Sequence, residues 1–141
     1  MFRVLTVLPK SVSHFPLETM STRVSDVLSM VLLGFNVLCI QAHMTDRFTP
    51  GFSRNLAEKL PQHNRVLFRW AGVSDSTLRA FFISLNLLFA VLLTIPSYRT
   101  LGLKIAVGGC CIGFYSDLKL GESPIPHLIL FGLIGGALYL A

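Results

Sequence analysis

Polar side chains that could do chemistry lie along an otherwise apolar stretch in the first third of the chain. Asn36, Cys39 and His43 are three and four residues apart, so they share one face of a helix. A neutral imidazole there can take a proton from a hydroxyl group or bind the oxygen of a quinone or phenol. Asn86 and His127 lie in two other apolar stretches. If all these side chains point into one interior, the candidate catalytic residues are His43, His127, Asn36 and Asn86.

The same four residues also have a structural interpretation. Amide side chains in apolar surroundings form hydrogen bonds between helices and stabilise their contact without doing chemistry. On this interpretation Asn36 and Asn86 hold helices together, and the two histidines lie at the surface of the apolar region. The sequence leaves both interpretations open.

Recognised metal and cofactor motifs are missing from the sequence. A metal site needs three or four convergent ligands. Cys39, His43, His127 and Asp117 could contribute, but no HxxxH or CxxC spacing connects them. A P-loop, a GxSxG motif, an HExxH motif and a dinucleotide fingerprint are also lacking. We therefore expect no metal site and no cofactor-binding site, and the sequence identifies no cofactor.

The elements that position these residues are long and apolar. Of the 141 residues, 52% are hydrophobic and only 13% are charged, and the mean hydropathy is +0.65. An ordinary soluble domain has about 25% charged residues. High apolarity with low charge excludes a disordered chain, and three cysteines exclude a scaffold held by disulfides. The composition favours an integral, multi-pass membrane protein.

Four stretches are apolar enough to form helices that cross a bilayer, for which about 20 residues are needed. They cover residues 24–42, 78–95, 100–116 and 124–141. Pro96 ends the second stretch, and the glycine- and proline-containing residues 121–126 separate the third from the fourth. A soluble bundle would show charged residues at helical spacing on its outer face, whereas residues 125–141 contain no Asp, Glu, Lys or Arg. The sequence predicts an all-α, four-helix transmembrane bundle.

A different segment precedes the first apolar stretch. Its short apolar run is interrupted by Thr6 and Pro9, and no small-x-small cleavage site follows, so it does not match a signal peptide. We expect residues 1–23 to be a flexible leader and residues 24–141 to form one membrane domain.

The loop between the first two apolar stretches contains a short amphipathic segment. Phe52, Leu56 and Leu60 recur at four-residue spacing, which predicts a helix that begins near Pro50 and ends at Pro61. Its basic and aromatic residues are typical of a segment at the lipid headgroups. The formal net charge of +5 would permit nucleic-acid binding, but basic residues next to a membrane need no such partner. We expect membrane lipid as a partner and no nucleic acid.

Glycines at four-residue spacing predict close helix packing. Gly109 and Gly113 lie in the third apolar stretch, and Gly132 and Gly136 lie in the fourth. Small residues at this spacing let helix backbones approach closely. They predict packing of the third helix on the fourth, or a protein partner or homodimer that binds through Gly132 and Gly136.

Three short motifs resemble the DoxX-like family of small four-helix membrane proteins. The first stretch continues into a basic loop as VLLGFNVLCIQAHMTDRFTPGF, and the second reads STLRAFFISLNLLFAVLLTIP, with Asn86 in mid-helix and Pro96 at its end. His127 lies near the start of the fourth stretch. Many family members carry an acidic residue or glycine where this chain has Asn86 and Leu87. The resemblance covers residues 24–141 and implies the fold. It also implies a range of functions, from quinone-coupled sulfur oxidation to roles beside fungal natural-product genes.

Two functions follow from the sequence. The lack of a catalytic motif favours an accessory or interaction protein in a membrane. The polar residues within the apolar stretches favour an alternative, a membrane-embedded oxidoreductase or biosynthetic enzyme. Its substrate would be a lipophilic small molecule, aromatic or quinone-like, for example in natural-product biosynthesis. A cavity lined by at least three of the four candidate residues would favour the second function.

Overall fold

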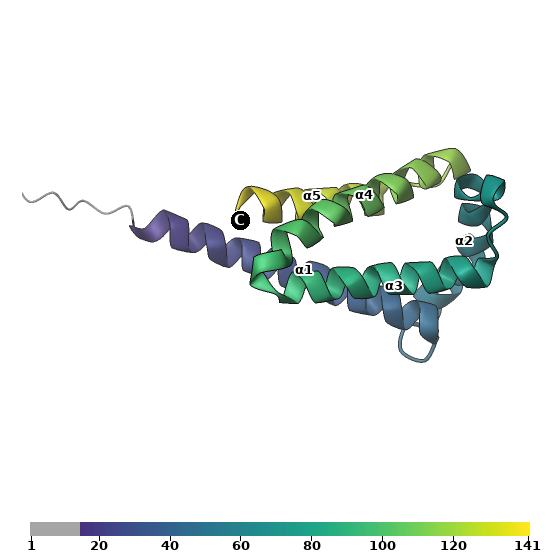
Figure 1. The fold of residues 1–141 in the computed structure, drawn as a ribbon, viewed down its shortest axis with the longest axis horizontal. Helices are drawn as coiled ribbons and strands as arrows, with labels where there is room; N and C mark the ends of the chain where they lie inside the picture. The colour runs from purple at the N-terminus through teal and green to yellow at the C-terminus, as the bar shows by residue number, and fades with distance from the viewer. Residues whose placement is uncertain (1–14) are drawn as a thin grey trace, which may run out of the picture.

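The computed structural model describes residues 15–141, and these residues form helices joined by short connections (Figure 1). The all-α prediction is confirmed for this part of the chain. The helices are α1 (Phe15–Met44), α2 (Pro50–Leu67), α3 (Asp75–Thr94), α4 (Pro96–Leu120) and α5 (Ile125–Tyr139), with a 3-10 turn at Arg69–Ala71.

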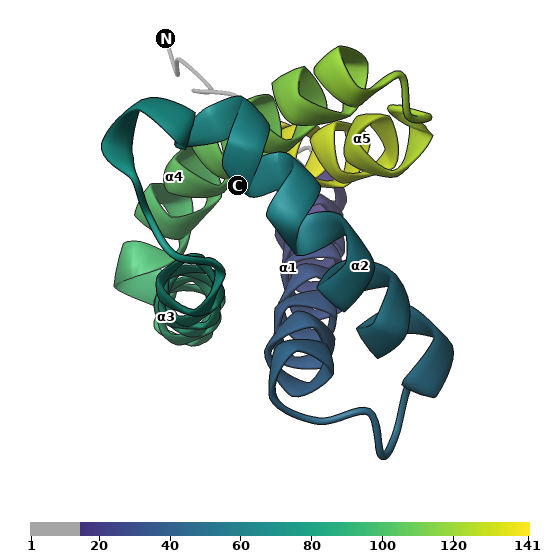
Figure 2. The same ribbon diagram turned by 90° about the vertical axis from the view of Figure 1, so that its right-hand side faces the viewer.

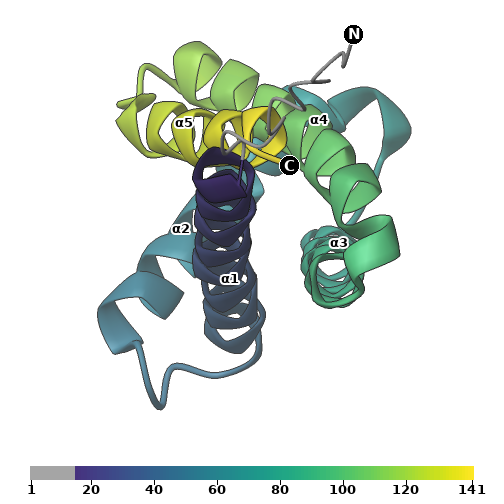
Figure 3. The ribbon, with the colours of Figure 1, turned by 90° about the vertical axis from the view of Figure 1, so that its left-hand side faces the viewer.

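Four helices run lengthwise, and α2 lies across one end of them (Figures 1 and 2). Helix α1 contacts α3 and α5, and α4 contacts the same two helices, so the four form a closed ring of neighbours. Figure 3 shows this ring from the end opposite α2, with the C-terminus beside α1. Helix α2 contacts α1, α3 and α4. Its position makes one end of the bundle chemically different from the other.

Among the described residues, three helices, rather than the four expected, are long and apolar enough to cross a membrane. They are Thr22–Met44 of α1, the whole of α3 and the whole of α4. The fourth expected stretch, 124–141, is helical only over the 15 residues of α5. At 1.5 Å per residue α5 is about 22 Å long, which is shorter than the ~30 Å hydrocarbon core of a bilayer.

Two helices begin earlier than the sequence predicts. Helix α1 begins at Phe15, so the later part of the expected leader is helical, and residues 1–14 lie outside the described residues. Helix α4 begins at Pro96 instead of residue 100, because proline is well suited to a first helical turn, where its missing N–H removes no hydrogen bond. Gly102 lies inside α4. A Cβ at Gly102 would lie 2.8 Å from Leu92 Cβ, which shows how closely α3 and α4 cross there.

The amphipathic helix between the first two long helices is confirmed, but its predicted end is wrong. Helix α2 continues through Pro61 to Leu67. A proline inside a helix costs about 3 kcal/mol, and tertiary contacts on both sides of it offset this cost. Leu60 is buried before the proline, and Asn64 is buried after it. Asn64 Nδ2 donates hydrogen bonds to Val73 O and to an Asp75 side-chain oxygen, at 2.8 and 2.7 Å, which fixes the end of α2 beside the start of α3.

The apolar core lies in the half of the bundle away from α2. It consists of Leu32, Leu93, Leu103, Cys110, Ile134 and Ala137. The end near α2 buries several polar residues together, namely Ser53, Asn64, Ser116 and Asp117. Burying polar groups is unfavourable unless they form hydrogen bonds, so this end is where a functional site is expected.

Candidate functional site

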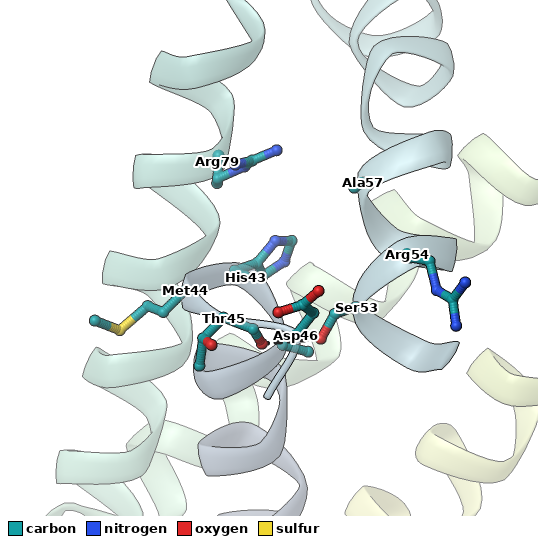
Figure 4. A pocket seen from close by; sticks show the side chains of 9 residues that line it. His43, Met44, Thr45, Asp46, Ser53, Arg54, Ala57 and Arg79 are labelled. Carbon is teal, nitrogen blue, oxygen red and sulfur yellow. Dashed lines mark hydrogen bonds between the residues drawn. The ribbon is translucent and has the colours of Figure 1, made fainter. Parts of the chain in front are cut away.

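A cavity of about 310 Å³ opens where the end of α1, the start of α2 and the start of α3 meet (Figure 4). This volume is at the lower end of the range for small-molecule sites. The cavity, called the His43 pocket below, is lined by polar side chains that include His43, Thr45, Asp46, Ser53, Arg54 and Arg79.

His43, Asp46 and Arg79 point toward the same space in this pocket, whereas Met44 and Arg54 point away from it (Figure 4). Arg54 is held by a 3.2 Å hydrogen bond from its Nε to Pro50 O. Within residues 15–141, Arg79 and Asp46 form no side-chain hydrogen bond or ion pair. The pocket therefore presents a base, a cation and a carboxylate that are available to a bound molecule.

Ring stacking and hydrogen bonds around the pocket hold these groups in place. The His43 ring stacks on Phe82, with centroids 6.0 Å apart and an interplanar angle of 12°. Phe82 lies one turn after Arg79, so α3 supplies both the aromatic ring and the cation. The turn between α1 and α2 is fixed by Thr49 Oγ1, which donates to Gln41 Oε1 at 2.7 Å. Ser53 Oγ also donates to the backbone carbonyl of Thr45 at 3.0 Å.

Of the four residues proposed from the sequence, only His43 lines this pocket. Asn36 Nδ2 donates to Leu32 O at 2.7 Å, and Asn86 Nδ2 donates to Phe82 O at 2.8 Å. Both bonds stay within one helix, because an amide can reach the carbonyl four residues earlier. Asn86 is connected to the pocket indirectly, through the backbone of the residue on which His43 stacks.

His127 belongs to a second polar group, which the sequence analysis did not find. This group, the His63 cluster, brings together side chains from α2, α4, the loop after α4, and α5. Its members are Lys59, His63, Ser116, Asp117, Glu122 and His127.

Three pairs hold the His63 cluster together. His63 Nδ1 and Ser116 Oγ share a hydrogen bond of 2.6 Å. His127 Nδ1 donates to Asp117 Oδ2, also at 2.6 Å. Lys59 forms an ion pair with Glu122. Ser116 is fully buried, and the Asp117 side chain is only 8% exposed. The pairs connect α2 to α4 and α4 to α5 at the end of the bundle.

Gly113 makes room for His127. A Cβ at Gly113 would lie 2.1 Å from His127 Nε2, so the ring packs directly on the α4 backbone. This contact agrees with the predicted close packing of the third and fourth apolar stretches. Gly136 instead faces Leu28 of α1, with 3.2 Å between a Cβ and Leu28 Cδ1, and Gly132 has no neighbour within 4 Å.

His63 is surrounded by charges of both signs. Burial lowers the pKa of His63 below its usual value, and Lys59 and His127 act in the same direction. Asp117 and Glu122 oppose this change and favour the protonated ring. The net effect is a neutral imidazole at neutral pH, with a nitrogen lone pair available for bonding.

Two signals in the sequence point to this cluster. The four-residue repeat of Phe52, Leu56 and Leu60 continues past Pro61 to Asn64, and extending the helix places His63 beside the buried face. The second signal is Asp117, which the sequence offers as a possible metal ligand. The structure buries it.

Over residues 15–141 the fold is all-helical, with three apolar helices long enough to cross a membrane and a small-molecule-sized polar pocket at one end. A comparison with known protein families finds no match, and no solved structure matches the chain. Curated proteins do match. The chain is 56% identical to the cyclic ether formation enzyme xenC of Xenoacremonium sinensis over 118 residues, which are 84% of this chain and 96% of the relative.

A second relative is the cyclic ether formation enzyme gkaZ of Penicillium citrinum. It is 47% identical over 125 residues, which are 86% of this chain and 98% of the relative. The chain belongs to this family of fungal cyclic ether formation enzymes. Membership favours the biosynthetic alternative over the accessory protein that the lack of a catalytic motif suggested.

Proposed function

We propose that this chain is a multi-pass membrane enzyme that closes a cyclic ether ring in a lipophilic, hydroxylated small molecule during natural-product biosynthesis. Its two relatives are named for cyclic ether formation, and the similarity covers nearly all of each relative. The observation that carries the proposal is the His43 pocket, where a base and a cation face one small-molecule-sized space.

The surface of the long helices supports a membrane location. Large apolar side chains are exposed on each of them, for example Val31, Leu88 and Ile112. Extended apolar surface of this kind is unusual in water, but it suits contact with lipid. The α2 end has exposed arginines, and Trp70 is 85% exposed, as suits a position among lipid headgroups. The DoxX-like resemblance stays a prediction about the fold.

Ring closure needs a nucleophilic oxygen and an activated carbon in the same molecule. In the proposed step a substrate hydroxyl attacks an electrophilic carbon, such as that of an epoxide or conjugated carbonyl, and a C–O bond forms. His43 takes the hydroxyl proton. The displaced electron pair moves onto another substrate oxygen, which Arg79 stabilises as negative charge develops. His43 then returns the proton, so the product is an isomer of the substrate and no oxidant is consumed.

The other parts of the pocket fit this role. Stacking on Phe82 fixes the orientation of the imidazole and gives an aromatic surface against which an apolar substrate can pack. Asp46 points into the same space, where its carboxylate can accept a hydrogen bond from a substrate hydroxyl. Holding both reacting groups in one folded conformation lowers the entropic barrier to ring closure.

Complementation tests the proposal. A Penicillium citrinum strain without its cyclic ether formation enzyme would receive the present chain or a variant, and extracts would be compared by liquid chromatography and mass spectrometry. We expect the unmodified chain to restore the cyclic ether, and His43→Ala and Arg79→Gln to leave an uncyclised isomer of the same mass. Arg65→Gln, which changes an exposed arginine outside the pocket, is the matched control.

Two results would contradict the proposal in different ways. If the unmodified chain is produced and restores no product, the assigned reaction is wrong. If it restores the product and both pocket variants do so equally well at equal protein level, the His43 pocket is not the active site.

A further inference from the structure

We infer that the His63 cluster binds a divalent transition-metal ion, with His63, Asp117 and Glu122 as ligands. This inference concerns a part of the molecule that the proposed reaction does not use, and it does not depend on that reaction.

The first argument is that the three side chains converge on one point. One potential ligand atom from each of these three residues lies within 4.8 Å of the other two. In a tetrahedral zinc site with bonds of about 2.1 Å, ligand atoms are about 3.4 Å apart. Closing the set around an ion therefore takes only side-chain rotations. The three residues come from α2, α4 and the loop after α4, so the ion would join elements that are far apart in the chain.

The local backbone supports this arrangement. Gly121 adopts a left-handed conformation with φ 69°, which ends α4 and turns the chain back. As a result Glu122 N donates to Asp117 O at 2.9 Å, and both carboxylate residues lie on the same turn. The outer contacts also match those of metal sites, where hydrogen bonds orient the ligands. Ser116 orients His63, and His127 orients Asp117.

The chemistry of the donors selects the class of ion. One imidazole nitrogen with two carboxylate oxygens is a set that suits zinc and related divalent transition metals. Three protein ligands leave further coordination positions for water or another molecule.

The charges of the cluster also favour binding of a cation. Asp117 and Glu122 contribute two formal negative charges, and Lys59 contributes one positive charge, so the cluster is one charge short of balance when both histidines are neutral. A divalent ion on the two carboxylates would compete with the Lys59 ammonium for Glu122. The Lys59 side chain is 33% exposed, so it can turn into solvent when the ion binds.

The experiment uses the full chain, purified in detergent without a histidine tag and treated with a chelator. All proteins carry Cys111→Ser, because Cys111 is an exposed thiol that could bind zinc by itself. Zinc chloride alone is the probe. We expect one zinc per chain by calorimetry. At free zinc one hundred times the Kd, the unfolding temperature should rise by roughly 5–10 °C.

Variants separate a metal site from a purely structural set of ion pairs. Glu122→Gln keeps the shape of a partly exposed side chain and should weaken zinc binding at least tenfold, as should Asp117→Asn. Lys59→Met should tighten zinc binding several-fold, because it removes the competing cation. Glu58→Gln, which changes an exposed carboxylate outside the cluster, should leave zinc binding unchanged.

The opposite results would overturn the inference. They are no zinc-dependent rise in the unfolding temperature of the parent protein, unchanged zinc affinity in Glu122→Gln, or weaker binding in Lys59→Met. Because Asp117 is buried and its variant can misfold, Glu122→Gln and Lys59→Met decide the outcome by themselves.

Discussion

Gly113→Ala tests whether the contact between α4 and His127 holds the end of the bundle together. The added methyl group would lie 2.1 Å from His127 Nε2, so the ring must leave its place. Its hydrogen bond to Asp117 Oδ2 would then be lost, and a carboxylate that is 8% exposed would have no partner.

The size of the effect follows from these contacts. Leaving a buried carboxylate without its hydrogen-bond partner costs about 3 kcal/mol, and the Asp117 side chain is only 8% exposed. Alanine is favoured over glycine inside a helix by about 1 kcal/mol. We therefore expect Gly113→Ala to lower the free energy of unfolding by about 2 kcal/mol.

A double-mutant cycle isolates the cause. In a His127→Ala background the methyl group meets no ring, so Gly113→Ala should stabilise the protein by up to ~1 kcal/mol, which gives a coupling of about 3 kcal/mol. Unfolding would be measured by circular dichroism in mixed micelles with increasing dodecyl sulfate. Gly108→Ala is the matched control, because a Cβ at Gly108 of the same helix has nothing within 4 Å. A coupling near zero, or equal effects at Gly113 and Gly108, would refute the reasoning.

Three further changes test other contacts. Ser74→Ala removes the hydroxyl that accepts the Thr77 N–H at the start of α3. It should lower the free energy of unfolding by about 1 kcal/mol, measured in the same micelles. Gly102→Ala places a methyl group 2.8 Å from Leu92 Cβ and should cost about 1–3 kcal/mol, whereas an unchanged stability would mean that α3 and α4 cross less closely. Phe82→Leu removes the ring under His43 and should reduce cyclic ether formation in the complemented strain more than it reduces protein level. Unreduced product would show that stacking does not position His43.

The sequence was sufficient for the parts of the fold that depend on local signals. Apolar runs, the proline at Pro96 and the glycine at Gly121 place both ends of α3 and α4 to within a few residues, because these signals act on the backbone next to them. The start of α1 is predicted at residue 24 but lies at Phe15. Pro61 shows the limit of that reasoning. Its local cost is real, but burial of Leu60 and Asn64 offsets it, and burial depends on which helix α2 meets. That information lies in residues far away in the chain.

Only part of the candidate site could be predicted, because the rest depends on contacts between residues that are far apart in the chain. His43 could be proposed from its own surroundings, since a histidine at the end of an apolar helix is unusual. Arg79 could not be linked to it, because 36 positions of chain separate them in the sequence and only the folded connection brings α3 beside α1. Asn36 and Asn86 form their side-chain hydrogen bonds within their own helices. Residue spacing does not reveal whether an asparagine bonds to its own helix or to a neighbouring one.

Helix α2 contributes residues to both polar sites and so connects them. Ser53 and Ala57 line the His43 pocket, and Lys59 and His63 belong to the His63 cluster. These residues lie within three turns of one helix, so a change in how the cluster holds α2 also moves a wall of the pocket. Two of the three buried residues of α2, Ser53 and Asn64, are polar, and only Leu60 is apolar. Polar contacts of α2 to Ser116 of α4 and Glu122 of the following loop therefore help to determine where the pocket wall lies. Such contacts are needed at this end of the bundle, because the apolar core cluster lies in the other half and does not reach α2.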